Sequence, residues 1–131
     1  MTSEGPQLSS PHPHGQDLLV VEDLSIKFNP SRVTPPVVRG IDLHLEEKEI
    51  VGVVGESGAG KTVTALGVLG LLPPLPSCEV KGRVLYKGKN LLELPPEEMR
   101  RLRGRHISMV FQDPKASLNP VFRVGDQIAE I

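Results

Sequence analysis

The sequence contains little that would cross-link it or anchor it in a membrane. Its 131 residues include one cysteine, which excludes a disulfide framework within the chain and fits a reducing compartment. The longest nearly apolar run, residues 63–72, contains a threonine and two glycines and is far shorter than the ~20 residues that span a bilayer. Residues 1–16 are polar and proline-rich, without the apolar core of a secretory signal. These absences predict a soluble intracellular domain.

Positive and negative charges nearly cancel. Fifteen lysines and arginines stand against 16 aspartates and glutamates, which gives a net charge of -1. A chain so close to neutrality has no overall field that would hold nucleic acid or an anionic membrane. The basic run RRLRGRH at residues 100–106 could bind nucleic-acid phosphates, but it has no interleaved aromatic residue and follows Glu97 and Glu98. We interpret it as a solvated helix end and expect no nucleic-acid partner.

Residues 1–16 hold almost nothing that could build a core, so we expect a disordered N-terminal leader there. His12 and His14 stand in it as HPH. Such a pair suggests a metal-binding tract, but two ligands on an unstructured segment bind weakly, and a solvated tail is favoured. Order is expected from Asp17, with residues 17–131 forming one domain. Glycine and proline number 13 each, which predicts many turns.

Alternating apolar residues predict two strands near the start of the ordered part. Leu24, Ile26 and Phe28 alternate with polar neighbours, and the same period of two runs through residues 41–45. Residues 29–36 contain three prolines and are expected to form the loop between these strands. Half-buried strands joined by a loop are typical of an antiparallel layer.

A different pattern follows the second strand. Residues 50–54 are a continuous apolar run, as expected of a strand covered on both faces. Residues 61–72 are apolar around most of a helix and predict a buried helix, ended by the proline-rich residues 73–76. Gly67 and Gly70 lower the stability of that helix and are therefore expected where another element packs closely.

The second half of the chain is expected to contain short strands, helices and loops. The expected strands are residues 79–86 and a buried run at 106–111; the expected helices are residues 95–105, opened by two prolines, and the segment from residue 124 onward. Residues 87–90 and 112–120 are expected to form a turn and a loop. Cys78 falls in a proline-rich loop without a partner cysteine, so we expect no functional thiol.

The most specific motif is the run GESGAGKT, a full match to G-x-x-x-x-G-K-[ST]. Its members are Gly55, Glu56, Ser57, Gly58, Ala59, Gly60, Lys61 and Thr62. Glycines let successive main-chain N–H groups point at phosphate oxygens, and a helix starting near Gly60 adds the positive end of its dipole. Lys61 supplies a mobile cation for the β- and γ-phosphates, and the Thr62 hydroxyl can ligate Mg²⁺. The motif predicts a nucleoside triphosphate site; a glycine-rich turn that binds nothing is the alternative.

With this loop, two further stretches resemble the ATP-binding subunits of ABC transporters, in particular the dipeptide, oligopeptide and nickel importer group. They are VTALGVLGLLPP, directly after the loop, and MVFQDPKASLNP at residues 109–120. The resemblance runs from about Leu18 to residue 131, and FQDP-x-x-SLNP is its more group-specific part. It implies an α/β fold, a P-loop NTPase core with an antiparallel β-subdomain. Residues 17–131 would then be the N-terminal part of a nucleotide-binding domain, truncated before the signature and Walker B motifs.

The resemblance also assigns roles to residues. Gly55 to Thr62 corresponds to the Walker A loop that binds ATP, with Lys61 as a catalytic residue and Thr62 as a ligand of Mg²⁺. Gln112 matches the Q-loop glutamine, a catalytic residue that in the family reaches the Mg²⁺ and the attacking water; a polar residue that ends a strand is the alternative. Phe28 looks like the aromatic residue that stacks on adenine, and plain strand core is the other interpretation. Nothing makes Glu56 a catalytic base.

By the same resemblance, the whole protein would couple ATP binding and hydrolysis to the import of a peptide, an oligopeptide or a nickel-like solute. It would work as a dimer with a second nucleotide-binding domain, identical or related, beneath transmembrane permease subunits that the Q-loop contacts. Its place would be cytoplasmic, peripheral on the inner face of the cell membrane. Selectivity for the solute would lie largely in the membrane subunits and the binding protein.

Three motifs of the family do not occur in these 131 residues: an LSGGQ-like signature, a Walker B strand that ends in Asp-Glu, and a switch histidine. Without them the attacking water lacks a base and a dimer mate cannot close over the γ-phosphate. We therefore expect negligible ATP hydrolysis by this chain alone. Two alternatives stay open. One is a naturally truncated nucleotide-binding fragment without ATPase activity, and the other is a different P-loop enzyme such as a small-molecule kinase or GTPase. The FQDPKASLNP stretch argues against the kinase and the GTPase.

Overall fold

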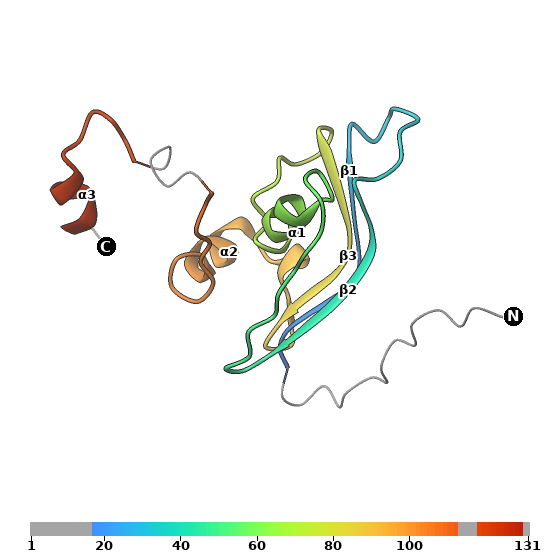
Figure 1. The fold of residues 1–131 in the computed structure, drawn as a ribbon, viewed down its shortest axis with the longest axis horizontal. Coiled ribbons are helices and arrows are strands. Elements are labelled where there is room, and N and C mark those ends of the chain that lie inside the picture. The colour runs from blue at the N-terminus through green and yellow to red at the C-terminus, as the bar shows by residue number, and fades with distance from the viewer. Residues whose placement is uncertain (1–16, 113–117, 130–131) are drawn as a thin grey trace, which may run out of the picture. The chain divides into compact units, whose positions relative to one another are not determined.

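The structure, a computed structural model, describes residues 17–112 and 118–129. The chain divides after Met99 into two compact units. The first is a four-stranded antiparallel sheet with a helix on one face (Figure 1). The strands are β1 (Asp17–Phe28), β2 (Val38–Glu46), β3 (Cys78–Tyr86) and β4 (Lys89–Asn90). The helices are α1 (Lys61–Val68), the 3₁₀ turn η1 (Leu91–Glu93), α2 (Pro96–Leu102) and α3 (Val124–Ala129).

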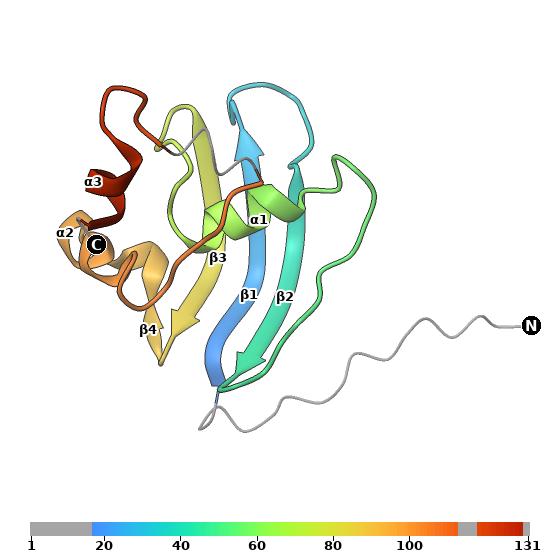
Figure 2. The same ribbon diagram turned by 60° about the vertical axis from the view of Figure 1, so that its left-hand side comes forward.

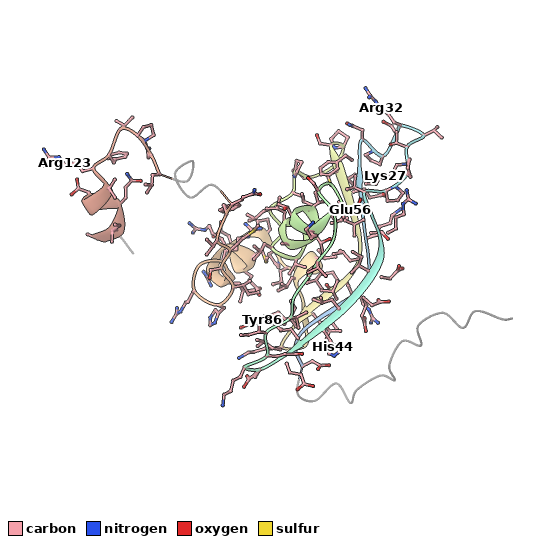
Figure 3. The ribbon with its side chains drawn as sticks, in the orientation of Figure 1. Lys27, Arg32, His44, Glu56, Tyr86 and Arg123 are labelled. Atoms are coloured by element: carbon pink, nitrogen blue, oxygen red, sulfur yellow. The ribbon has the colours of Figure 1, made fainter. Side chains whose placement is uncertain are left out.

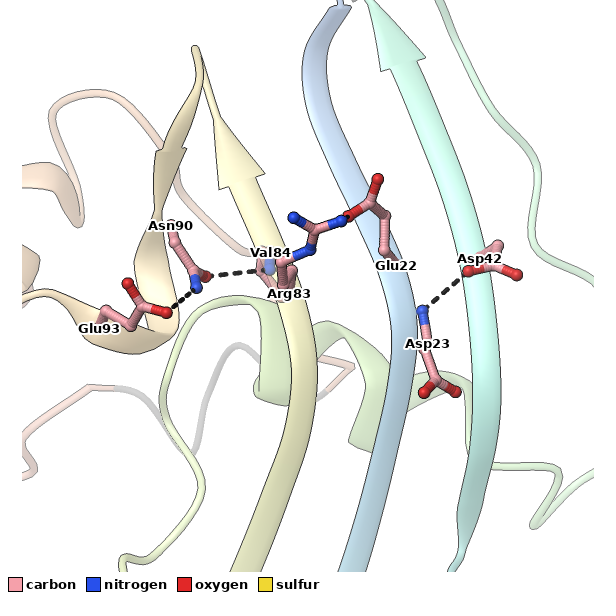
Figure 4. Close-up of polar contacts among 7 residues, drawn as sticks. All are labelled: Glu22, Asp23, Asp42, Arg83, Val84, Asn90 and Glu93. Atoms are coloured by element: carbon pink, nitrogen blue, oxygen red, sulfur yellow. Dashed lines mark hydrogen bonds and ion pairs between the residues drawn. The ribbon is translucent and has the colours of Figure 1, made fainter. Parts of the chain in front are cut away.

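The sheet has the order β2-β1-β3-β4, and each neighbouring pair is antiparallel. The antiparallel layer predicted from the alternating apolar residues is therefore confirmed. α1 lies across one face of the sheet, over β1 (Figures 1 and 2). On the opposite face, the Glu22 carboxylate of β1 and the Arg83 guanidinium of β3 are 2.6 Å apart (Figure 4). Because the arginine side chain is 64% exposed, this pair adds less than about 1 kcal/mol.

A line of left-handed residues crosses the three long strands at one level. Asp23, Gly40 and Gly82 have φ angles of 47°, 55° and 108°. The register of β1 shifts against both neighbours at this level. Side chains satisfy two of the main-chain groups there. Asp23 N–H donates to Asp42 Oδ1 at 2.8 Å (Figure 4). Gly40 N–H donates to Ser25 Oγ at 2.9 Å. Irregularities of this kind bend strands, and the sheet is curved (Figure 1).

The core lies between the sheet and α1. Its fully buried large side chains are those of Val21, Leu24, Ile26 and Val84. Gly67 of α1 lies directly against β1, because a Cβ atom on Gly67 would stand 2.6 Å from Ile26 Cδ1. The close approach expected at this glycine is confirmed.

α1 is shorter than predicted and less buried. It ends at Val68, well before the prolines that were expected to stop it, and Gly67 is its one buried residue. Gly70 adopts a φ of 59° and its N–H donates to Gly67 O at 3.1 Å, while Leu71 N–H donates to Leu66 O at 2.9 Å. This pair of bonds around a left-handed glycine is the Schellman helix end. Gly70 therefore terminates the helix.

The predicted buried strands at residues 50–54 and 106–111 are wrong for this structure. Residues 50–54 lie outside every strand, and Ile50 and Val54 are 96% and 94% exposed. In residues 106–111 only Ile107 forms a bridge, with Arg103, and Val110 is 91% exposed. A strand covered on both faces needs hydrogen-bonded neighbours and covering helices. The described part of the chain supplies neither to these two runs.

Asn90 joins the end of the sheet to η1. Its Oδ1 accepts a hydrogen bond from Val84 N–H at 3.2 Å, and its Nδ2 donates to Glu93 Oε1 at 2.8 Å (Figure 4). The same Oδ1 accepts from Leu92 N–H at 3.3 Å. One side-chain amide thereby caps η1 and extends the pairing of β3.

Both helices predicted in the last third of the chain are present in the structure. α2 begins at Pro96, as predicted, and ends at Leu102, earlier than expected, because a turn with Gly104 at a φ of 79° follows it. α3 begins at Val124, as predicted. Among the helices in residues 17–112 and 118–129, none is long and apolar enough to cross a bilayer.

Candidate functional site

The glycine-rich loop of residues 55–60 leads into α1. Gly58 and Gly60 have φ angles of 84° and 89°, a conformation that L side chains rarely adopt. A Cβ atom on Gly60 would also stand 3.3 Å from Val37 O and from Val38 Cγ2, so the loop is seated against the start of β2. A Cβ atom on Gly58 would meet nothing within 4 Å, which leaves open space beside the loop. The two glycines are thus required by backbone conformation, and the space beside Gly58 is free for a ligand.

The Lys61 side chain bonds to the main chain of the glycine-rich loop. Its Nζ donates to Gly55 O and to Glu56 O, each at 2.7 Å. An ammonium group has three N–H donors, so one remains for a ligand after these two bonds. A positive charge is therefore positioned over the loop before any ligand arrives.

The first turn of α1 points open N–H groups at the same place. Gly60 is the N-cap and provides no side-chain cap, and residues 61–68 carry no acidic side chain in the first turn. Thr64 N–H is the first to bond within the helix, to Gly60 O at 2.8 Å. The N–H groups that precede it have no intrahelical acceptor, which is the arrangement that binds phosphates at helix N-termini. Thr62, whose hydroxyl was predicted to bind Mg²⁺, lies exposed in this turn.

The other members of the motif border the loop. Glu56, Ser57 and Ala59 are exposed, and Ala59 N–H donates to Glu56 O at 3.2 Å. Figure 3 shows Glu56 next to α1, toward the end of the sheet at which Lys27 lies and away from Tyr86 and His44. Glu56 thus contributes its main-chain oxygen to Lys61, and no contact of its carboxylate marks it as a catalytic base within the described residues.

Phe28 is the last residue of β1 and is half-buried. It follows Ile26 by two positions and therefore shares the face of the sheet on which Ile26 packs against Gly67. Ile26 pairs in turn with Val38, whose side chain borders Gly60. Val38 thus makes neighbours of three segments: the end of β1, the start of β2 and the glycine-rich loop. No local pattern in the sequence predicts this contact.

Gln112 lies in the other unit of the chain. It is exposed and belongs to the second unit, directly before residues 113–117, which lie outside the described residues. Part of the FQDP-x-x-SLNP stretch falls on those residues, and His12 and His14 of the expected leader are outside the described residues as well. The role of Gln112 stays a prediction.

Two further sequence interpretations concern residues away from the loop. Arg100 and Arg101 occupy the last turn of α2, where basic side chains complement the helix dipole, as in a solvated helix end. Cys78 was wrongly placed in a loop: it is the first residue of β3 and is buried, because Phe28 pairs with it from β1. That burial raises the pKa of the Cys78 thiol, because it disfavours the charged thiolate.

A metal held by protein ligands alone finds no support in the described ranges. No group of three or more His, Cys, Asp or Glu side chains comes together there. Residues 55–62 instead carry groups that suit an anion, namely main-chain N–H donors, one ammonium group and two hydroxyls, beside the exposed carboxylate of Glu56.

Comparison with known proteins gives this site a context. The sequence model of the ABC transporter family matches residues 38–130. A probable peptide ABC transporter ATP-binding protein of Sinorhizobium fredii is 47% identical over 119 residues, which are 91% of this chain and 36% of that protein. An oligopeptide and a dipeptide transport ATP-binding protein of Bacillus subtilis are 43% and 44% identical, over 87% and 88% of this chain and 32% and 34% of their own length. The chain therefore spans about a third of the length of these three relatives.

Proposed function

The chain belongs to the ABC transporter family, and on that premise we propose that it binds MgATP at residues 55–62. The observation that supports this proposal is the preformed loop, with left-handed glycines, a lysine held by two carbonyl oxygens, and an open helix N-terminus. Family membership favours this interpretation over a small-molecule kinase or a GTPase. We propose further that residues 17–131 belong to a nucleotide-binding domain with a P-loop core, of which the antiparallel sheet is the β-subdomain.

The residues of the loop divide the work of binding. Main-chain N–H groups of Gly58 and of residues 60–62 face the phosphate oxygens, and the third N–H of Lys61 reaches the β- and γ-phosphates. The Thr62 hydroxyl and, from the second unit, Gln112 are proposed to hold Mg²⁺, which when bound neutralises phosphate charge. Phe28 is proposed to stack on adenine at the end of β1. Lys61 and Gln112 are the residues of this chain that we assign to catalysis in the whole protein.

The names of the relatives suggest what the whole protein does. We propose that it is the ATP-binding component of an importer for peptides, oligopeptides or a nickel-like solute, coupling ATP binding and hydrolysis to transport. Its partners would be transmembrane permease subunits and a second nucleotide-binding domain. It would therefore work in the cytoplasm, on the inner face of the cell membrane. Nucleic acid has no place in this function.

Titration of the chain with MgATP tests the binding site. Binding should be saturable, and Lys61→Ala should weaken it at least tenfold, about 1.4 kcal/mol, because the variant loses both the phosphate contact and the bonds that hold the loop. Lys81→Ala is the matched control, since Lys81 is an exposed lysine of β3 paired with Glu79, and it should bind MgATP as the wild type does. No binding by a chain that circular dichroism shows to be folded would refute the proposal.

A further inference from the structure

The carbonyl oxygen of Gly60 accepts two hydrogen bonds from the same residue. Thr64 donates its main-chain N–H at 2.8 Å and its hydroxyl, Oγ1, at 2.9 Å. The first bond is the one that begins α1, between residues four apart. A helix does not need the second, because a threonine hydroxyl that bonds to the carbonyl four residues before it does not strengthen the helix. The stability of α1 therefore does not explain the hydroxyl bond.

Gly60 stands where the glycine-rich loop turns into α1. It is buried, has φ and ψ angles of 89° and 1°, and provides no side-chain cap. Its main chain lies against β2, since a Cβ atom there would be 3.3 Å from Val37 O and from Val38 Cγ2. Glycine has fewer excluded backbone conformations than any other residue. The peptide that joins Gly60 to Lys61 is therefore free to turn over unless its carbonyl is held.

The orientation of this peptide decides where the main-chain N–H of Lys61 points. The peptide is trans, so its carbonyl and its N–H point in opposite directions. The carbonyl of Gly60 points along α1 to Thr64, and the N–H of Lys61 therefore points out of the N-terminus of the helix. A peptide that turned over would lose both bonds to Thr64 and would direct this N–H back into α1. Two bonds to one carbonyl oppose that change more strongly than one.

We propose that Thr64 is a positioning residue for phosphate binding, whose hydroxyl holds the Gly60–Lys61 peptide so that the Lys61 N–H faces a phosphate oxygen. The inference rests on the proposed function, in which nucleotide binds at residues 55–62. The motif G-x-x-x-x-G-K-[ST] ends at Thr62, so it assigns nothing to Thr64. Thr64 is half-buried, touches no nucleotide in this role and acts through Gly60.

Three substitutions separate the hydroxyl from the rest of the side chain. Thr64→Val keeps the shape and removes the hydroxyl, Thr64→Ala removes it and favours the helix, and Thr64→Ser keeps it. The Kd for MgATP, measured with the 131-residue chain, should rise about fivefold in the Val and Ala variants and stay within about twofold of the wild type in the Ser variant. A role in helix stability alone would predict the opposite order for Ala and Ser, because alanine is the stronger helix former.

Val68→Thr is the matched control. Val68 is the last residue of α1 and is half-buried, so this variant makes the reverse exchange on the same helix, away from the glycine-rich loop. It should bind MgATP as the wild type does. Circular dichroism establishes that each variant is folded at the temperature of the titration, and if Thr64→Val does not fold, Thr64→Ala decides.

The NMR signal of the Lys61 amide gives a second readout, without nucleotide. It should be single in the wild type and in Thr64→Ser, and broadened or doubled in the two variants whose peptide turns over. An unchanged signal in those variants would overturn the proposal, because the peptide would then be fixed without the hydroxyl.

The affinities distinguish the two proposals from each other. An unchanged Kd in folded Thr64→Ala, or an equal loss of affinity in Thr64→Ser or Val68→Thr, would overturn the positioning role and leave the MgATP site in place. A folded wild type that binds no MgATP would instead refute the proposed function, and this inference with it.

Discussion

Lys61 and Gln127 each bond to main-chain groups of a loop that would otherwise depend on water. Lys61 bonds to two carbonyl oxygens of the glycine-rich loop, and Gln127 bonds to the main chain of Asn119 and Phe122. Loops expose polar backbone that must find partners, and one long side chain provides several at once. At the residue scale, each of these two loops is therefore held by one long side chain that bonds to main-chain groups a few residues away.

At the same scale, the Cys78 thiol makes the free energy of unfolding depend on pH. Burial favours the neutral thiol, so its pKa in the folded chain lies above the ordinary value of 9.0. The corresponding stability is fully present below that value and is lost as the pH rises through the folded pKa, because the unfolded chain releases the proton first. The free energy of unfolding should therefore fall with pH above about 9 more steeply in the wild type than in Cys78→Ala, measured by urea denaturation.

Thiol labelling provides the check on this prediction. The Cys78 thiol should react with a disulfide reagent at pH 8 at least tenfold more slowly in the native chain than in urea. Equal rates in the two states would contradict the burial of Cys78, and parallel pH profiles for the wild type and Cys78→Ala would contradict its pKa shift.

At the scale of elements, the antiparallel sheet joins segments both near and far in the sequence, because β1 pairs with β2 on one side and with β3 on the other. β1 pairs with β2 across one proline-rich loop, and a line of left-handed residues bends the three long strands together. Gly82 of β3 is the tightest of these, because a Cβ atom there would stand 2.5 Å from Asp23 O and 2.6 Å from Glu22 O. Backbone atoms cannot move aside without breaking the pairing of β1 and β3.

Gly82→Ala should therefore destabilise the chain by about 3 kcal/mol or more, since left-handed strain and a backbone clash act together. Gly88→Ala is the matched control. Gly88 also has a positive φ, of 79°, but a Cβ atom there would meet nothing within 4 Å, so its cost should be about 1 kcal/mol. Urea denaturation of the two variants measures the difference. Equal costs would show that the contact with Asp23 and Glu22 does not decide the stability of the sheet.

On the scale of the whole molecule, the chain leaves apolar segments uncovered. Ile50, Val54 and Val110 are more than nine-tenths exposed, at 96%, 94% and 91%. Side chains of this type are usually buried, and an exposed run of them marks a surface that another segment or partner covers. The chain covers 36%, 32% and 34% of the three relatives compared above.

The 131-residue chain alone should accordingly bind MgATP without turning it over. It carries no signature, no Walker B Asp-Glu and no switch histidine, so its attacking water has no base and no dimer mate closes the site. Phosphate release should not exceed the background measured for Lys61→Ala. Turnover above that background, abolished by Lys61→Ala, would contradict the prediction.

Local patterns predicted most of the elements and failed where distant partners decide. The alternation around Leu24 and Ile26 marked a strand, and the prolines at 95 and 96 marked the start of α2, because each signal acts within a few residues. The strand predicted at residues 50–54 is absent. A continuous apolar run shows that a strand there could be buried, but it does not show whether neighbouring strands and covering helices are present. Cys78 misled for a related reason: pairing with Phe28, far back in the sequence, makes it a strand residue.

The sequence by itself determined the family and the position of the glycine-rich loop, because the types of residue that a phosphate requires stand next to one another in it. Only the tertiary structure decided that Lys61 bonds to two loop carbonyls, that Val38 of β2 borders Gly60, and that Gln127 holds Asn119. Each of these contacts depends on which segments the folded chain brings within bonding distance. Distances of that kind follow from packing and hydrogen bonding across elements, on which a local pattern of residues carries no information.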